Sequence, residues 1–191
     1  KLIIGYDHRF GHGRHGDLAY LNQVGPQFGF SVVEIGQQEV EEIAVSSTKI
    51  RYALAHQKIE TAATFLGRHY NLMGKVVHGD KRGRQIGFPT ANLELVEPSK
   101  LVPADGVYAT WAYLGKKKFA SMTNIGFRPT VDGKKHSIET HLLDFDKDIY
   151  NQNLNLEFVQ LLRMEKRFNG LEELKSQLEQ DRLNTRNVLF A

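Results

Sequence analysis

The stretch Asn153-Leu-Asn-Leu-Glu-Phe-Val-Gln-Leu-Leu-Arg163 alternates apolar and polar residues. A period of two is typical of a β-strand, because successive side chains point to opposite faces of a sheet. The expected buried face consists of Leu154, Leu156, Phe158 and Leu162, and the expected solvent face of Asn153, Asn155, Glu157 and Arg163. We therefore predict a strand over 153–163 with one face in a core and the other in water.

The same period recurs upstream of this stretch, as far as about Leu72. Gly, Pro, Asp and Lys residues that favour turns separate the candidates. The six strand candidates are 72–78, 90–96, 106–114, 117–125, 137–145 and 153–163. Six short strands in succession predict a β-barrel.

A helix is expected to close the chain. It begins near Asn169, where an Asn N-cap and Glu172 three residues later form a variant of the capping box. Leu171, Leu174 and Leu178 recur at helical spacing and predict the buried stripe of this helix.

Residues 1–67 have a different, α/β pattern. An apolar start and the strand-like Phe30–Ile35 precede a helical stretch, for which Ser47 is the expected N-cap and Gly67 the expected stop. We place the domain boundary between Gly67 and Leu72, which gives a first domain over 1–67 and a second over 68–191. The expected fold class is α+β overall.

Composition excludes several classes of protein. The 191 residues include 25 Lys and Arg, 22 Asp and Glu and no Cys, so disulfides, thiolate metal clusters and a cysteine nucleophile are excluded. No apolar run approaches the ~18 residues of a membrane span, and no signal peptide is recognisable. The cytoplasm is the expected location. The chain starts at Lys1 within a strand-like segment, so we expect a fragment.

Glycines and cations gather upstream of residue 92. Four glycines follow one another at spacings of five, four and four: Gly74, Gly79, Gly83 and Gly87. The cations Lys75, Lys81, Arg82 and Arg84 accompany them, with Asp80 as the one acid among them. Such a loop lets backbone N–H groups and cations approach phosphate oxygens, although it is not a Walker A motif. A solvated Gly-rich hairpin explains the same pattern.

Two further patterns add oxygen ligands and a carboxylate. Thr90 and Asn92 are two residues apart on an extended chain, so their hard oxygen donors point the same way and suit Mg²⁺. A turn in which both bond to local backbone is the alternative. Glu139 shares a strand face with His141 and apolar residues, where a carboxylate can act as a general base. An isolated Glu on a solvated face is the commoner case.

Two N-terminal patterns are weaker. His8, His12 and His15 have the spacing of a helical metal site, but neighbouring glycines argue against a helix. A phosphate-contacting loop or a solvated loop fits them better. The segment Ser46-Ser-Thr-Lys-Ile-Arg51 places hydroxyls at a helix N-terminus, where either an anion site or a bare cap is expected.

These motifs resemble a known family in their order along the chain. The strings GKVVHGDKRGRQIGFPTAN (74–92), GVYA (106–109), TNIGFRPT (123–130), SIETHLLDF (137–145) and LRMEKRF (162–168) resemble the riboflavin kinase domain across roughly residues 68–185. The strings GYDHRFG (5–11) and VSSTKIR (45–51) resemble the C-terminal part of an FMN adenylyltransferase module. Together they resemble bacterial bifunctional riboflavin kinase/FMN adenylyltransferases.

The resemblance implies a six-stranded Greek-key barrel with a C-terminal helix, preceded by a partial α/β nucleotidyltransferase-like segment. It implies riboflavin and ATP as substrates and Mg²⁺ as cofactor. Thr90 and Asn92 would ligate Mg²⁺ and the ATP phosphates, and Gly79 and Arg84 would line the ATP loop. Glu139 would be the base for the ribityl hydroxyl.

The resemblance also implies roles for two other groups of residues. Arg163, Lys166 and Phe168 match the flavin-side loop, where a cation can meet the phosphate of FMN and an aromatic ring can contact the flavin. The remnant of the adenylyltransferase motif consists of Ser46, Ser47, Thr48 and Arg51.

The adenylyltransferase resemblance is incomplete. His12-Gly-Arg-His15 lies after the GxD segment, so the HxGH-type motif that handles the incoming ATP has no counterpart. We expect riboflavin phosphorylation without FAD synthesis in this chain, and both activities in a full-length parent.

Two other function classes are weighed. One is a non-catalytic barrel that binds flavin or nucleotide. The other is a nucleic-acid-binding barrel, for which Lys116, Lys117 and Lys118 beside Trp111, Tyr113 and Phe119 would be the signature. Neither a nucleic-acid nor a membrane partner is expected, and the oligomeric state stays open.

Overall fold

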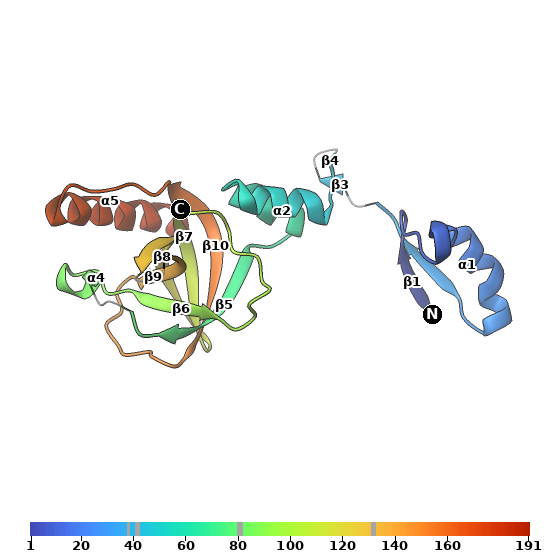
Figure 1. Cartoon of the computed structure of the whole chain (residues 1–191), viewed down its shortest axis with the longest axis horizontal. Helices are drawn as coiled ribbons and strands as arrows, with labels where there is room; N and C mark the ends of the chain where they lie inside the picture. The colour runs from blue at the N-terminus through green and yellow to red at the C-terminus, as the bar shows by residue number, and fades with distance from the viewer. Residues whose placement is uncertain (38, 41–42, 80–81, 131–132) are drawn as a thin grey trace. The chain divides into compact units, whose positions relative to one another are not determined.

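The computed structural model describes residues 1–37, 39–40, 43–79, 82–130 and 133–191 (Figure 1). Contacts divide the chain into two compact units, Lys1–Ser46 and Ser47–Ala191. The first unit contains two two-stranded sheets and the second a closed barrel. The functional residues predicted above fall mainly in the second unit.

The first unit contains a short parallel pair of strands. β1 (Leu2–Gly5) pairs with β2 (Val32–Ile35), and α1 (Leu18–Val24) lies between them in the chain. Asp17 caps α1 by accepting a hydrogen bond from the Tyr20 N–H. The remaining elements are the 3₁₀ turns η1 (His12–Arg14) and η2 (Gly25–Phe28) and the strands β3 (Glu39–Val40) and β4 (Ile43–Ala44).

The second unit contains a closed antiparallel barrel. Its strands are β5 (Tyr70–Val77), β6 (Ala91–Leu95), β7 (Gly106–Leu114), β8 (Lys117–Thr130), β9 (Gly133–Leu142) and β10 (Asn153–Arg163). They pair in the order β10-β5-β6-β9-β8-β7 and back to β10. β7, β8 and β9 form a meander and β6 lies beside β9, which is the Greek-key arrangement. The barrel and its strands confirm the sequence-based prediction.

The alternation in β10 holds only as far as Phe158. Leu154, Leu156 and Phe158 are buried in the barrel core as predicted. The pairing with β7 then shifts between Phe158 and Gln160, which is a β-bulge that reverses the faces. Leu161 therefore packs on the barrel core, and Leu162 packs outside it with the C-terminal helix. The prediction that Leu162 shares the core face was wrong.

Two helices precede the barrel and pack on it. α2 (Ser47–Ala55) and α3 (Ile59–Leu66) contribute Leu54, Ile59 and Ala62 to the barrel core. α2 begins at Ser47, so Ser47 is its first residue and not its N-cap. Gly67 ends α3 in the left-handed conformation, as predicted. The compact unit thus begins about 20 residues before the domain boundary expected from the sequence, because these buried side chains join the two helices to the barrel.

The C-terminal helix α5 (Leu171–Phe190) packs against β7, β8 and β10. Its N-cap is Gly170, and the Glu173 carboxylate accepts hydrogen bonds from Asn169, from both its N–H and its amide. The predicted cap at Asn169 with Glu172 was therefore misplaced by one residue. Leu178 packs on an apolar cluster outside the barrel core, formed by Phe88, Ala120, Met122 and Leu143. Leu171, by contrast, is 66% exposed.

α4 (Arg82–Gln85) is a single turn between β5 and β6. Across the described residues, no helix combines the length and the apolar character needed to cross a membrane.

Candidate active site

A row of polar side chains crosses three strands on the outer wall of the barrel. Glu139 on β9 pairs with Asn92 on β6 and with Asn124 on β8. Directly paired residues share one face of a sheet. The neighbours of Glu139 along β9, Ile138 and Thr140, are buried inside the barrel. Glu139 and the two amides therefore face outward, and the predicted orientation of Glu139 is confirmed.

Thr90 joins this row from the loop that enters β6. Its hydroxyl Oγ1 donates a hydrogen bond to Glu139 Oε2 at 3.3 Å. The Ser137 hydroxyl lies 3.5 Å from the other carboxylate oxygen, Oε1. Thr90 and Glu139, which are 49 positions apart in the sequence, are thus in direct contact. In the sequence, only the family resemblance connected these two residues.

Thr90 also lies between two cavities. The first cavity, of about 420 Å³, is lined by Thr90, Arg84, Lys147 and apolar residues that include Phe145 and Tyr150. The second cavity, of about 410 Å³, lies between the outer wall of the barrel and α5, and its lining includes Thr90, Glu139 and Lys166. Thr90 lines both cavities, so groups bound in them would meet beside its hydroxyl and the Glu139 carboxylate.

The glycine-rich loop reaches the same place. A Cβ added to Gly79 would lie 2.2 Å from Asn92 Nδ2, so the backbone of Gly79 presses against the Asn92 amide. Any side chain at position 79 would therefore force the Asn92 amide to move. Arg84 lines the first cavity, and its part in an ATP loop stays a prediction. Three charged residues of the glycine-rich loop cannot be placed in the site: Asp80 and Lys81 lie outside the described residues, as does the side chain of Arg82.

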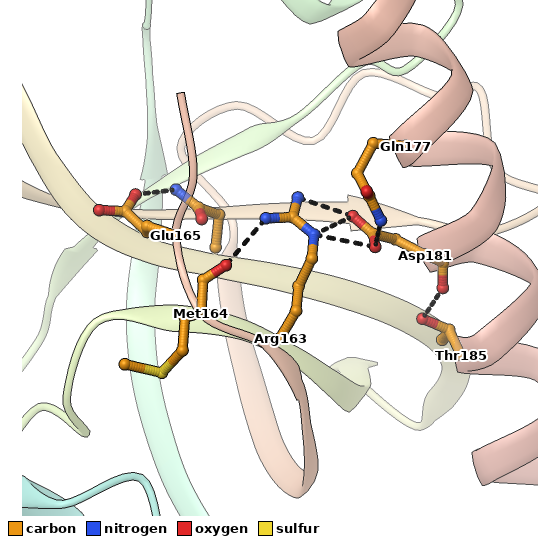
Figure 2. A network of polar contacts seen from close by, with 7 residues as sticks. Arg163, Met164, Glu165, Gln177, Asp181 and Thr185 are labelled. Carbon is orange, nitrogen blue, oxygen red and sulfur yellow. Dashed lines mark hydrogen bonds and ion pairs between the residues drawn. The ribbon is translucent and has the colours of Figure 1, made fainter. Parts of the chain in front are cut away.

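The predicted flavin-side residues all line the second cavity, but they are not equivalent. Lys166 Nζ lies 4.9 Å from the centre of the Phe168 ring, a cation–π contact. Arg163 also lies over this ring, with its guanidinium carbon 5.7 Å from the ring centre. It extends toward α5, where its guanidinium donates to both carboxylate oxygens of Asp181 (Figure 2). The sequence-based analysis did not identify Asp181, because an acid in a helix of mixed charge carries no signal that it is buried.

His141 is a further site residue that the sequence-based analysis described but gave no role. It is 8% exposed, lines the second cavity and shares a hydrogen bond between its Nδ1 and the Pro89 carbonyl at 2.8 Å. That carbonyl precedes Thr90 in the chain. Burial lowers the pKa of His141, and the bond to Pro89 opposes this shift. The imidazole is therefore neutral at pH 7 and ties β9 to the loop that carries Thr90.

Other predicted positions line neither of the two cavities. Ser47, Thr48 and Arg51 are on α2, in the second compact unit, while Ser46 ends the first. Their role as an adenylyltransferase remnant stays a prediction.

The three N-terminal histidines are not on a helix. His12 starts the 3₁₀ turn η1, in which Gly13 has φ +61°, and His8 stacks on Phe10. The glycines therefore interrupt an α-helix here, as expected from the sequence, and the spacing of the histidines does not reflect a helix.

The lysine-rich turn contacts its own aromatic residues. Lys118 Nζ lies 3.9 Å from the centre of the Trp111 ring and 5.8 Å from that of Tyr113. The cation covers ring faces on which a base would have to stack, and this arrangement disfavours the nucleic-acid-binding alternative.

Two family models match the chain. The riboflavin kinase model matches residues 66–189, and the FAD synthetase model matches residues 1–49. The first match contains the barrel, α5 and both cavities. Residues 50–65, which include most of α2 and α3, lie between the two matches.

The chain is similar to curated bacterial proteins named bifunctional riboflavin kinase/FMN adenylyltransferase. It is 40% identical to that of Escherichia coli (strain K12) over 97% of this chain and 59% of the relative. It is 42% identical to that of Pseudomonas fluorescens over 94% of this chain and 58% of the relative. The chain therefore spans less than two thirds of the length of these relatives.

A solved structure also matches. The crystal structure of a protein named macrolide-efflux protein from Streptococcus pneumoniae superposes with a TM-score of 0.86 and 34% identity. The match covers 97% of this chain and 60% of that one.

Proposed function

Since this chain belongs to the riboflavin kinase family, we propose that it transfers the γ-phosphate of ATP to the 5′-hydroxyl of riboflavin. The products are FMN and ADP. The observation that carries the proposal is the position of Thr90, which lines both cavities and donates a hydrogen bond to Glu139. A two-substrate transfer needs two adjoining sites that meet at the reacting atoms.

We assign ATP to the first cavity and riboflavin to the second. The first cavity offers Arg84 and Lys147 to the phosphates, and Phe145 and Tyr150 as apolar surface for a base. The second offers a long apolar wall that includes Phe88, Met122 and Leu178, which suits a flat flavin ring. Lys166 and Phe168, which the family resemblance assigns to the flavin, line that cavity and contact each other.

Glu139 is the proposed general base. It lines the second cavity next to Thr90, where the hydroxyl to be phosphorylated would lie. The carboxylate takes the proton of the 5′-hydroxyl while that oxygen forms a bond to the γ-phosphorus, and the bond from the γ-phosphorus to the bridging oxygen of ADP breaks. The base needs only modest strength, because the transition state of phosphoryl transfer is loose and the bond to the attacking oxygen is little formed in it.

The donors present fit a magnesium ion. Thr90 and Asn92 contribute a hydroxyl and an amide oxygen, which are hard ligands, and both neighbour Glu139, Thr90 through its hydrogen bond and Asn92 across the β6–β9 pair. We propose that these two residues hold Mg²⁺ together with the ATP phosphates. When bound, the ion neutralises charge on the phosphate oxygens.

Other readings are less well supported. A barrel that only binds flavin or nucleotide has no need of the carboxylate that Thr90 orients, so the Thr90–Glu139 contact favours catalysis. The name of the Streptococcus pneumoniae protein refers to efflux, whereas the family models and the bacterial relatives refer to flavin chemistry, which the two cavities fit. A cytoplasmic location and the small molecules riboflavin and ATP as partners accompany the proposal.

The test is to incubate the purified chain with riboflavin, ATP and Mg²⁺ and to separate the flavins chromatographically over time. We expect FMN without FAD, and no FMN when EDTA removes the metal. Formation of FAD as well would show that residues 1–67 carry adenylyltransferase activity. Riboflavin that is bound but never phosphorylated would replace the kinase proposal with the binding-only barrel.

A further inference from the structure

Asp181 is a buried carboxylate held by an unusually complete set of partners. It is 1% exposed on α5. Arg163 donates to it from Nε at 3.0 Å to each oxygen and from Nη2 at 2.8 Å, and Gln177 Nε2 donates at 2.8 Å. The Thr185 hydroxyl bonds to the Asp181 carbonyl one turn along the helix (Figure 2). A planar guanidinium fork of this kind fixes orientation as well as distance.

The fork connects three parts of the second cavity. Arg163 is the last residue of β10, and its Nη1 also donates to the carbonyl of Met164 at 3.1 Å. Met164 begins the connection to α5, residues 164–170, which we call the 164–170 segment. Lys166 and Phe168 on this segment and Leu174 and Leu178 on α5 line the second cavity. One guanidinium thus holds the barrel, the segment and the helix together.

A second contact holds the same segment to the barrel. Asn124 Nδ2 on β8 donates to Glu165 Oε1 at 3.2 Å (Figure 2). A Cβ on Gly126 would lie 1.8 Å from that oxygen, so glycine leaves the space that the carboxylate fills. The Glu165 contact holds the start of the segment against β8. The Arg163 fork holds Met164 at the same end and, through Asp181, the helix that follows the segment.

We propose that Asp181 is a positioning residue for the flavin substrate, acting through Arg163 on the wall of the second cavity formed by the 164–170 segment and α5. The role rests on the proposed function, because riboflavin is the ligand assigned to this cavity. The family resemblance implies that a cation of the flavin-side loop, Arg163 or Lys166, meets the phosphate of FMN. In the structure the Arg163 fork is committed to Asp181, so the carboxylate determines where the cation and the wall lie.

The two roles of Arg163 predict opposite effects of changing Asp181. If Arg163 serves only as a direct flavin contact, freeing it in Asp181→Asn leaves riboflavin binding intact or improves it. If the fork positions the wall, Asp181→Asn raises the KM for riboflavin by roughly 10- to 100-fold, as displacement of a positioning group does. The KM for MgATP stays unchanged, because the first cavity lies on the other side of Thr90.

A double variant separates positioning from stability. Breaking a buried ion pair by changing one partner destabilises a protein, whereas replacing both partners by apolar residues of similar volume is often neutral. Arg163→Met combined with Asp181→Leu is therefore expected to unfold near the wild-type temperature while the KM for riboflavin stays raised. This variant also keeps the test valid if Asp181→Asn does not fold.

The matched control is Arg186→Met. Arg186 lies on the same helix and pairs with Asp144 at 2.7 Å, but on an exposed surface, with 45% of the Arg186 side chain accessible. We expect its loss to leave the KM for riboflavin unchanged.

Trypsin cleavage provides a readout that does not depend on activity. Lys166 and Arg167 are cleavage sites within the 164–170 segment, and we expect faster cleavage there in Asp181→Asn than in the wild type. Cleavage and riboflavin KM that both match the wild type, or a double variant whose KM recovers with its stability, would overturn the positioning role. A wild-type chain that forms no FMN would overturn the proposed function instead, and the cleavage rates alone would then decide whether Asp181 holds the segment.

Discussion

Glu139 illustrates how alternation along one strand can place a functional side chain. Its neighbours Ile138 and Thr140 are buried, so a period of two suffices to turn the carboxylate outward. The contact with Thr90 could not be derived in this way, because it depends on which strand lies beside β9. Only the family resemblance linked the two residues before the fold was known.

Replacing Glu139 by Gln should lower the turnover number by roughly 10²–10⁴-fold, the usual contribution of a general base. The amide keeps the shape of the side chain but does not take up the hydroxyl proton, so the affinity for ATP should change little. Steady-state assays of FMN formation and nucleotide titrations measure the two effects. Glu94→Gln, on an exposed position of β6, is the control. Full activity of Glu139→Gln would refute the role of base.

Protonation of His141 should make the barrel less stable in weak acid. Burial lowers the pKa of His141 below its ordinary 6.5, and the charges around it are Arg182, Asp144 and Glu179. The unfolded chain therefore takes up a proton before the native chain does. Stability present above pH 6.5 is lost as the pH falls through the native pKa, by about 1.4 kcal/mol per unit of difference.

Asparagine at position 141 keeps a donor for the Pro89 carbonyl but does not titrate. Urea unfolding at pH 7.5 and at pH 5 should therefore show a smaller loss of stability in His141→Asn than in the wild type. Equal losses in the two proteins would mean that other groups account for the acid sensitivity.

At the scale of elements, the strands were predictable and their details were not. A period of two in the sequence was enough to locate the six strands, because it does not depend on what a strand pairs with. The burial does not alternate throughout, since β7 is buried continuously over Gly106–Thr110 and β10 changes face after Phe158. The bulge after Phe158 and the cap of α5 at Gly170 depend on the register with β7 and on the path of the segment before the helix. The bulge leaves no mark in the local sequence, and at the cap both Asn169 and Gly170 are residues that favour an N-cap.

The interior of the barrel contains a row of hydroxyl groups that periodicity does not reveal. Thr110 Oγ1 lies 2.7 Å from Thr123 Oγ1 and 2.8 Å from Ser121 Oγ, and Thr123 Oγ1 lies 2.8 Å from Thr140 Oγ1. All four residues have no exposed surface. Thr has a high strand propensity, so the sequence does not distinguish these threonines from other strand residues.

Thr123→Val should destabilise the barrel by about 1–3 kcal/mol, because valine has the same shape but removes two buried hydrogen bonds, to the Thr110 and Thr140 hydroxyls, at about 0.5–1.5 kcal/mol each. Thr123→Ser keeps the hydroxyl and should recover the part of the loss that is due to hydrogen bonding. Urea unfolding of the three proteins measures the difference. A Val variant as stable as the wild type would indicate that the row contributes nothing net.

For the whole molecule, the two compact units divide the chain earlier than the sequence suggested. Gly67 is a strong local stop signal, and a boundary there follows from local rules. Packing places the division at Ser46 and Ser47, because Leu54 and Ile59 are buried in the barrel core. The Ala104 N–H also donates to the Leu54 carbonyl, which ties α2 to the chain before β7.

Two truncations distinguish the boundaries. A chain of residues 47–191 should keep the thermal transition of the barrel and the ability to form FMN. A chain of residues 68–191 should lose much of its stability, at roughly 1.5–3 kcal/mol for each fully buried Leu or Ile side chain removed. Calorimetry of both fragments is the measurement, and equal stability of the two would place the boundary at Gly67 after all.

Because β10 closes the barrel, the barrel of a growing chain stays open until this strand has been synthesised. β10 is the last strand to be synthesised, yet it pairs with β5, the first, and with β7. Lys75 meets Asn153 only after the ribosome has added the intervening residues, and such distant pairings form slowly. A nascent chain that stops before Asn153 presents the open edges of β5 and β7, where other chains can add. Translation must therefore pass Arg163 before the barrel is protected from aggregation.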